Sequence, residues 1–226
     1  MYKIETHLHT AEVSACGHLC AAEMMRLYAE AGYSTVVVTD HCKKGYFDRC
    51  GDLPWEEKAA MFFRGGEAAK EAGGPLGLTV LTAAELSFKK TAPNDYLVYG
   101  FDREFLTAHP DVFEWELSRF HEAARERGML VIQAHPHRDG NCRPTPEFVD
   151  GFEIYNSNPR HEDHSELSER CAREHHLLWT AGSDAHRTED VAGSGLLSET
   201  PVRTMEELIA LIRSGRQQMI RREGTL

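Results

Sequence analysis

The sequence predicts an α/β fold, with a closed or nearly closed barrel as the first expectation and an open doubly wound sheet as the alternative. Short apolar runs alternate with amphipathic runs that favour helix, which is typical of βαβ units and a mainly parallel sheet. The length of 226 residues fits one domain, and a hydrophobic content of 41% supplies a sizeable core. No repeat or linker interrupts the pattern, so we expect a single domain over residues 1–226.

About seven strands are expected, because seven short runs are rich in apolar or β-branched residues. They are 2–6, 35–39, 78–84, 96–99, 129–132, 152–155 and 177–180. The run at 35–39 reads Thr-Val-Val-Val-Thr without polar alternation, which is typical of a strand buried on both faces. The expected helices are 21–31, 55–72, 112–127, 163–175 and 205–213. Three of them end at glycines, Gly32, Gly73 and Gly128, which commonly terminate helices.

Charge and composition exclude several classes of protein. The formal charge of −11 argues against a non-specific nucleic-acid surface, since such binding needs Lys and Arg on phosphates, although a nucleic acid could still be a substrate. No run approaches the roughly 20 apolar residues of a membrane span, and the N-terminus lacks the pattern of a signal peptide. The six cysteines form no Cys-x-x-Cys pair, so we expect reduced thiols and a cytoplasmic protein with no membrane partner. The sequence leaves the oligomeric state open.

Metal-binding residue types recur just past the C-terminal end of the predicted strands. They are His7 and His9, Asp40 and His41, Glu85, His135 and His137, and Asp184 and His186, while Asn156 follows a sixth strand. In α/β barrels this edge carries the active site, because the loops that follow the strands converge on one mouth. A lone His-x-His pair is more often a surface or core feature. Groups at the ends of five strands instead predict a shared metal site.

The spacing within these groups supports the same interpretation. Residues two apart on extended backbone point to one side, so His7 and His9 can offer imidazoles to one ion. Asp184 and His186 repeat this spacing. Imidazole suits zinc, iron and other transition metals, and a carboxylate such as Glu85 can bridge two ions.

These motifs resemble the polymerase and histidinol phosphatase (PHP) family. The resemblance rests on Glu5-Thr6-His7-Leu8-His9, Thr39-Asp40-His41, Glu85-Leu86-Ser87, Ala134-His135-Pro136 and Gly182-Ser183-Asp184-Ala185-His186. It implies a distorted (β/α)7 TIM-like barrel that holds two to three divalent metal ions, commonly zinc, iron or manganese. The matching segments run from residue 5 to about residue 190.

The resemblance also implies how the ligands are shared. His7, His9, Glu85 and Asp184 would hold the first metal, Glu85 and His135 the second, and His41 and His186 the third. Where many members have a histidine for the second metal, this chain has Asp95 as the nearest match. The loop after His-x-His offers His18 as the candidate for the third metal, with Cys16 as the alternative.

The expected activity is a metal-dependent phosphoesterase that releases phosphate from a small phosphorylated metabolite or nucleotide, through water activated by two metals. The alternatives are a metal-dependent amidohydrolase, a DNA-end exonuclease and an accessory PHP module. The expected catalytic or ligand-orienting residues are Asp40, His137 and Asn156. Phosphate needs fixed positive donors, and the candidates near the mouth are Lys43, Arg138, Arg160 and Arg187, of which we favour Arg138 and Arg160.

Overall fold

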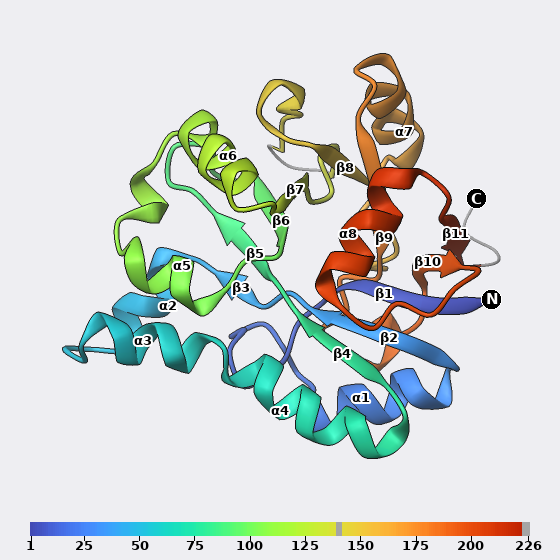
Figure 1. Cartoon of the computed structure of the whole chain (residues 1–226), viewed down its shortest axis with the longest axis horizontal. Helices are drawn as coiled ribbons and strands as arrows, with labels where there is room; N and C mark the ends of the chain where they lie inside the picture. The colour runs from blue at the N-terminus through green and yellow to red at the C-terminus, as the bar shows by residue number, and fades with distance from the viewer. Residues whose placement is uncertain (139–141, 223–226) are drawn as a thin grey trace.

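The computed structural model describes residues 1–138 and 142–222, and its elements are labelled in Figure 1. The strands are β1 (Tyr2–Leu8), β2 (Tyr33–Val38), β3 (His41–Cys42), β4 (Thr79–Thr82), β5 (Ala84–Ser87), β6 (Asp95–Tyr99), β7 (Leu130–Gln133), β8 (Gly151–Asn156), β9 (Leu178–Gly182), β10 (Ser194–Ser198) and β11 (Gln218–Arg221). The helices are α1 (Ala21–Glu30), α2 (Lys44–Arg49), α3 (Trp55–Phe62), α4 (Arg64–Gly73), α5 (Arg103–Ala108), α6 (Leu117–Glu126), α7 (Ser165–Glu174) and α8 (Met205–Ser214). Each strand expected from the sequence is present, so the mixed α/β class is confirmed.

The strands form two sheets rather than one continuous ladder over the described residues. The first sheet has the order β11-β10-β1-β2-β4, and the second has the order β3-β5-β6-β7-β8-β9. Five of the pairings are parallel, as expected from the βαβ pattern. The strand β6 runs antiparallel to both β5 and β7, and β10 runs antiparallel to β1 and β11. Among the described residues, the strand pairing therefore does not form the closed barrel that the sequence analysis expected.

The two sheets meet along two edges. On one side β4 and β5 are separated by one residue, Ala83, whose N–H donates to Val38 at 2.8 Å, so the chain passes directly between sheets. On the other side β1 lies against β9, where the Thr6 hydroxyl donates to the Ala181 carbonyl at 2.8 Å. The His9 N–H also donates to the Ala185 carbonyl at 3.0 Å. These contacts bring the ends of the strands to a common rim.

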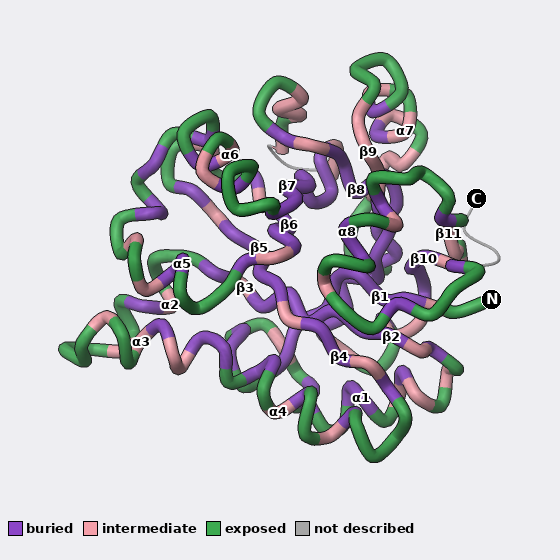
Figure 2. Tube along the Cα trace, in the orientation of Figure 1, coloured by how far each residue is buried: buried purple, intermediate pink, exposed green. Residues whose placement is uncertain are grey.

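Apolar packing holds the helices against the sheets. Figure 2 shows strands that are largely buried and helices that expose their outer sides. Helix α8 packs Leu208, Ile209 and Ile212 into one cluster with strand residues Ile4 and Leu130. Fully burying one such side chain contributes about 1.5–3 kcal/mol, so this helix firmly anchors the strands behind the rim.

Two helices expected as continuous are interrupted. The segment 55–72 divides at Phe63, which lets Phe62 pack on Phe47 while Phe63 stacks on Phe101. The segment 112–127 begins with a single 3₁₀ turn, and α6 starts only at Leu117. Tertiary packing of these large apolar side chains outweighs the helix propensity of the segments.

Elements that the sequence analysis did not identify lie mainly at edges. Strand β10 contains Gly195, and both β10 and β11 are short, so their sequences resemble loops. Among residues 1–138 and 142–222, no helix is both long and apolar enough to cross a bilayer.

Candidate metal centre

A cavity of about 280 Å³ opens at the rim where the two sheets meet. Its walls come from loops and strand ends that lie far apart in the sequence. The lining residues are Cys16, His18, His41, Glu85, Asp95, His135, Arg138, Asn158, Arg160, His161, Asp184, His186 and Arg187. Most of the predicted metal ligands therefore meet at one place, as the strand-end rule required.

The first cluster consists of His7, His9, Glu85 and Asp184. Nε2 of His7 lies 3.2 Å from Nε2 of His9 and 3.4 Å from Oε1 of Glu85. Oδ1 of Asp184 lies 3.2 Å from Nε2 of His9 and 3.5 Å from Nε2 of His7. Ligands about 2.0–2.1 Å from a tetrahedral zinc ion are about 3.3 Å from one another. The spacing of these four groups therefore fits a single divalent cation.

The second cluster shares Glu85 with the first and adds His135 and Asp95. Nε2 of His135 lies 3.1 Å from Oε1 of Glu85, and donor atoms of all three residues lie within 4.8 Å of one another. Asp95 also accepts a hydrogen bond from the Ser87 hydroxyl. Unlike the other cluster residues, Asp95 begins a strand rather than following one. Because β6 runs antiparallel to β5, its first residue lies at the rim where β5 ends. Asp95, the nearest match to the family's second-metal histidine, therefore lies beside Glu85 and His135, where it could bind a second metal.

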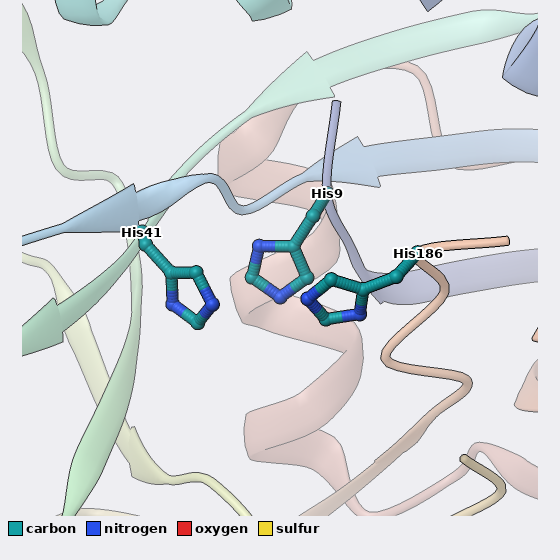
Figure 3. Close-up of side chains that lie close together, drawn as sticks. All are labelled: His9, His41 and His186. Carbon is teal, nitrogen blue, oxygen red and sulfur yellow. The ribbon is translucent and has the colours of Figure 1, made fainter. Parts of the chain in front are cut away.

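The third cluster consists of His9, His41 and His186, whose donor atoms lie within 4.8 Å of one another. Figure 3 shows the ring of His9 between the other two, at centroid distances of 4.2 Å from His41 and 4.3 Å from His186. Nδ1 of His41 lies 2.6 Å from Oε2 of Glu85. The cluster therefore borders the first one and faces the cavity.

Hydrogen bonds fix the orientation and tautomer of three histidines. A carboxylate or carbonyl oxygen can only accept, so Nδ1–H of His7 donates to Glu153 at 2.9 Å and Nδ1–H of His186 donates to the Asp184 carbonyl at 2.8 Å. The hydroxyl proton of Ser14 is given to Asp40, so Nδ1–H of His9 donates to Ser14 at 3.3 Å. When these imidazoles are neutral, the Nε2 lone pair of each ring points into the clusters, which is how ligating imidazoles are usually held.

In the metal-free protein, the charges of the clustered histidines and carboxylates offset one another. Burial alone would lower the pKa of His7, but the charges of Glu153, Asp184 and Glu85 raise it well above its ordinary value. Burial likewise opposes the charge of Glu85, yet His41 and His7 hold its pKa well below the usual range. A second proton on His7 therefore stands where a cation would otherwise neutralise the carboxylates. Metal binding at such a site must release protons.

Two buried atoms test whether the residues fit a cation. Nδ1 of His41 and Oε2 of Glu85 lie 2.6 Å apart, but among the described residues neither makes a hydrogen bond with acceptable angles. Buried polar atoms are normally paired, and the exceptions need an explanation such as an ion or water. Imidazole and carboxylate donors together suit zinc, iron and manganese. The donor set, its spacing and these atoms fit divalent metal ions.

The backbone at two proposed ligands is strained. His135 and Asp184 have φ values of 32° and 50°, in the left-handed region that residues other than glycine rarely adopt. Such conformations cost of order 1–3 kcal/mol each and concentrate at functional sites. Both residues follow the ends of strands, β7 and β9, so the turns direct their side chains back over the rim.

Two buried glutamates that the sequence analysis missed support the ligands. Glu153 receives His7 Nδ1–H, the N–H of His135 at 3.1 Å and Nδ2 of Asn156 at 2.9 Å. Glu5 accepts N–H groups of Thr6, His7 and Ser183 and the Tyr28 hydroxyl. A carboxylate inside an apolar strand is rare without such a role, and this was the available signal in Tyr2–Leu8 and Gly151–Asn156.

The three residues predicted to be catalytic or orienting lie around the clusters in different ways. Asp40 accepts the N–H and hydroxyl of Thr10 and the hydroxyl of Ser14, so it acts on His9 only through Ser14. Asn156 donates to Glu153 and thereby supports the ligands. His137 is not among the cavity-lining residues and instead pairs with the Ser168 hydroxyl at 3.0 Å.

The predicted phosphate-binding cations are placed unequally. Arg138 lines the cavity and donates to Asp184, while Arg187 lines it beside His18. Arg160 also lines the cavity, but its guanidinium is held by both carboxylate oxygens of Asp190, at 2.5 and 2.8 Å. Lys43 is exposed and is not one of the lining residues.

Comparison with known proteins supports the resemblance. A sequence profile described as PHP-associated matches residues 162–217. The matched segment spans α7, β9, β10 and α8, and its description agrees with the family that the motifs of the sequence resemble. No match was found among curated protein sequences.

Solved structures with the same fold belong to several proteins. PsfC from Pseudomonas syringae PB-5123 has a TM-score of 0.69 and 17% identity, over 98% of this chain and 92% of that one. A two-domain protein from Bacteroides vulgatus, containing a predicted PHP-like metal-dependent phosphoesterase, has a TM-score of 0.68 and 13% identity, over 98% and 65%. An amidohydrolase from Chromobacterium violaceum has a TM-score of 0.57 and 15% identity, over 92% and 96%. At these identities the likeness establishes the fold alone.

Proposed function

We propose that this chain is a metal-dependent hydrolase that releases phosphate from a small phosphate ester. The observation that carries the proposal is that two clusters share Glu85, whose carboxylate also lies 2.6 Å from His41 of the third cluster, at one cavity. His7, His9, Glu85 and Asp184 would hold the first metal, Glu85, Asp95 and His135 the second, and His41 and His186 the third. Divalent metals held there would activate water and neutralise charge on a phosphoryl oxygen.

The residues of this chain would bind and orient the substrate. A guanidinium has five N–H donors, so Arg138 can hold Asp184 and meet an anion at the same time. Arg187 lines the same cavity and is partly exposed, so it adds a second cation. Asn158 donates to the Asp184 carbonyl at 3.2 Å and lines the same cavity. These donors favour a dianionic group over a neutral one.

The size of the cavity favours a small substrate. Its volume of about 280 Å³ lies at the lower end of the usual range of about 300–1,000 Å³ for small-molecule sites. The formal charge of −11 gives no general attraction for a nucleic-acid backbone, which makes the exonuclease alternative less favoured. The nearly complete set of His and carboxylate residues makes the accessory-module alternative less favoured. Hydrolysis of an amide stays the main alternative, since the same ligands could serve it and an amidohydrolase shares the fold.

The test begins with metal analysis of the purified protein. Metal-free protein is then loaded with zinc, iron or manganese and assayed for phosphate release from phosphomonoesters and nucleotide bisphosphates, and for cleavage of cyclic amides. We expect metal-dependent phosphate release that Glu85→Gln abolishes and Arg138→Ala weakens mainly through KM. Arg125→Ala, at an exposed position on α6, is the matched control. Amide cleavage without phosphate release would refute the proposal.

A further inference from the structure

A cysteine stands at the mouth of the third cluster. Sγ of Cys16 lies 3.2 Å from Nε2 of His186, and Cys16 lines the same cavity as His41. Because Nδ1–H of His186 is already given to the Asp184 carbonyl, the Nε2 that faces the sulfur carries the free lone pair. Two independent elements, the segment after β1 and the turn after β9, thus direct donor atoms to one point.

The loop that carries Cys16 is fixed on both sides of the residue. The Gly17 N–H donates to the Ser14 carbonyl at 2.8 Å, and the His18 N–H donates to the His186 carbonyl at 2.8 Å. A side chain at Gly17 would lie 2.9 Å from the Thr10 carbonyl, so the turn packs closely on its own start. These contacts therefore hold the backbone on the C-terminal side of Cys16 against the turn that carries His186.

His18, the ligand expected from the sequence, is less suited to a cation. Its Nε2 lies 3.3 Å from Nη2 of Arg187, so a permanent positive charge stands at the atom that would bind metal. Cys16 has two histidines as neighbours instead. Zinc ligands at about 2.0–2.1 Å for nitrogen and 2.3 Å for sulfur would lie about 3.5 Å apart in a tetrahedron, close to the separation seen here.

We propose that Cys16, and not His18, completes the third metal site as a thiolate ligand beside His41 and His186. This inference rests on the proposed metal centre. On binding, a metal–sulfur bond forms and the thiol proton leaves to solvent. A thiolate selects zinc, cobalt or iron over harder ions such as magnesium and manganese. The carboxylate-rich second cluster lacks this preference, so the outer position has its own metal selectivity.

Cobalt(II) binding to the metal-free protein tests the ligand directly. We expect a near-ultraviolet thiolate-to-cobalt charge-transfer band that Cys16→Ser removes, while the visible ligand-field bands of cobalt at the other clusters persist. His18→Ala and Cys20→Ser are the matched controls and should keep the band. Cys142→Ser must also keep it, since the Cys142 thiol contacts His135 at the second cluster. Ligand-field bands without a charge-transfer band, or a band that survives Cys16→Ser, would overturn the inference. If no cobalt binds, the metal centre itself fails.

Alkylation of the wild-type protein gives a second measurement that needs no variant. Cys16 and Cys20 are both exposed, so iodoacetamide should label both in the metal-free protein. Zinc loading is expected to suppress labelling of Cys16 and leave that of Cys20 unchanged, as read by peptide mass spectrometry. Equal labelling of Cys16 with and without bound zinc would contradict thiolate ligation.

Discussion

Replacing Glu153 by glutamine should weaken metal binding without changing the volume of the side chain. Glu153 receives three donors: His7 Nδ1–H and Asn156 Nδ2–H at 2.9 Å, and the His135 N–H at 3.1 Å. A glutamine offers one oxygen and one NH₂ group, so in either orientation its NH₂ meets a donor. The change therefore removes at least one hydrogen bond that orients a metal ligand.

The expected size of the effect follows from two separate considerations. Outer carboxylates that orient ligating histidines typically change metal affinity by about 10- to 100-fold when removed. A hydrogen bond to a charged group contributes about 1.5–3 kcal/mol, which corresponds to about 10- to 150-fold at about 1.4 kcal/mol per tenfold. The two ranges agree, so we expect Glu153→Gln to weaken zinc binding by about 10- to 100-fold.

Competition for zinc between the protein and a chromophoric chelator measures this loss. Glu147→Gln makes the same chemical change at an exposed position six residues earlier and should leave the affinity unchanged. Circular dichroism of both variants checks that the fold is intact. A folded Glu153→Gln variant that binds zinc as tightly as the wild type would refute the idea that Glu153 orients the ligands.

Three other predictions concern the surroundings of the clusters. Gly182→Ala should lower both stability and zinc affinity, because the added Cβ would lie 2.4 Å from Cβ of His7, as denaturation and chelator competition would measure. Tyr28→Phe should lower the free energy of unfolding by about 1–3 kcal/mol in urea, because buried Glu5 loses a donor. In the metal-free protein burial lowers the pKa of His41, but the charge of Glu85 outweighs it and raises the pKa to about 10 from 6.5. The resulting stabilisation is complete below about pH 6.5 and is lost as pH rises through about 10, so thermal melting should show Tm falling there and His41→Gln should flatten the fall.

Each of these predictions has a control within the chain. A side chain at Gly74 would meet no atom within 4 Å and its φ is −54°, so Gly74→Ala should leave stability and zinc affinity unchanged. Tyr2 is exposed, and Tyr2→Phe should not alter urea unfolding. The pH prediction fails if the Tm of the metal-free protein is flat between pH 6.5 and 10.

Most residues of the clusters could be predicted because local sequence places them. Strand ends are visible in the sequence, and a period of two puts Glu5 and His7 on one side of β1, with His9 directly after it. The same period could have identified Glu5. Asp95 does not follow the rule, because it begins a strand that runs antiparallel to its neighbours. Strand direction depends on tertiary pairing, which no local pattern reveals.

Other features of the site depend on contacts between distant segments. Glu153 and Asn156 reach the same network although they are three residues apart, because the register of β8 against β9 shifts between Glu153 and Tyr155. Arg160 was favoured as a phosphate ligand, yet its partner Asp190 lies thirty residues further along the chain. Asp190 also accepts the N–H groups of His186 and Arg187, so this ion pair fixes the turn that carries a proposed metal ligand.

The line where β1 faces β9 gives the cations a mechanical role in addition to a chemical one. Few backbone hydrogen bonds cross this line, and the first cluster lies across it, with His7 and His9 on one side and Asp184 on the other. An ion bound by the first cluster would crosslink the sheet that contains β1 to the sheet that contains β9. Removing it would let amide protons of both strands exchange faster, while those of β6 and β7, inside the second sheet, would keep their protection.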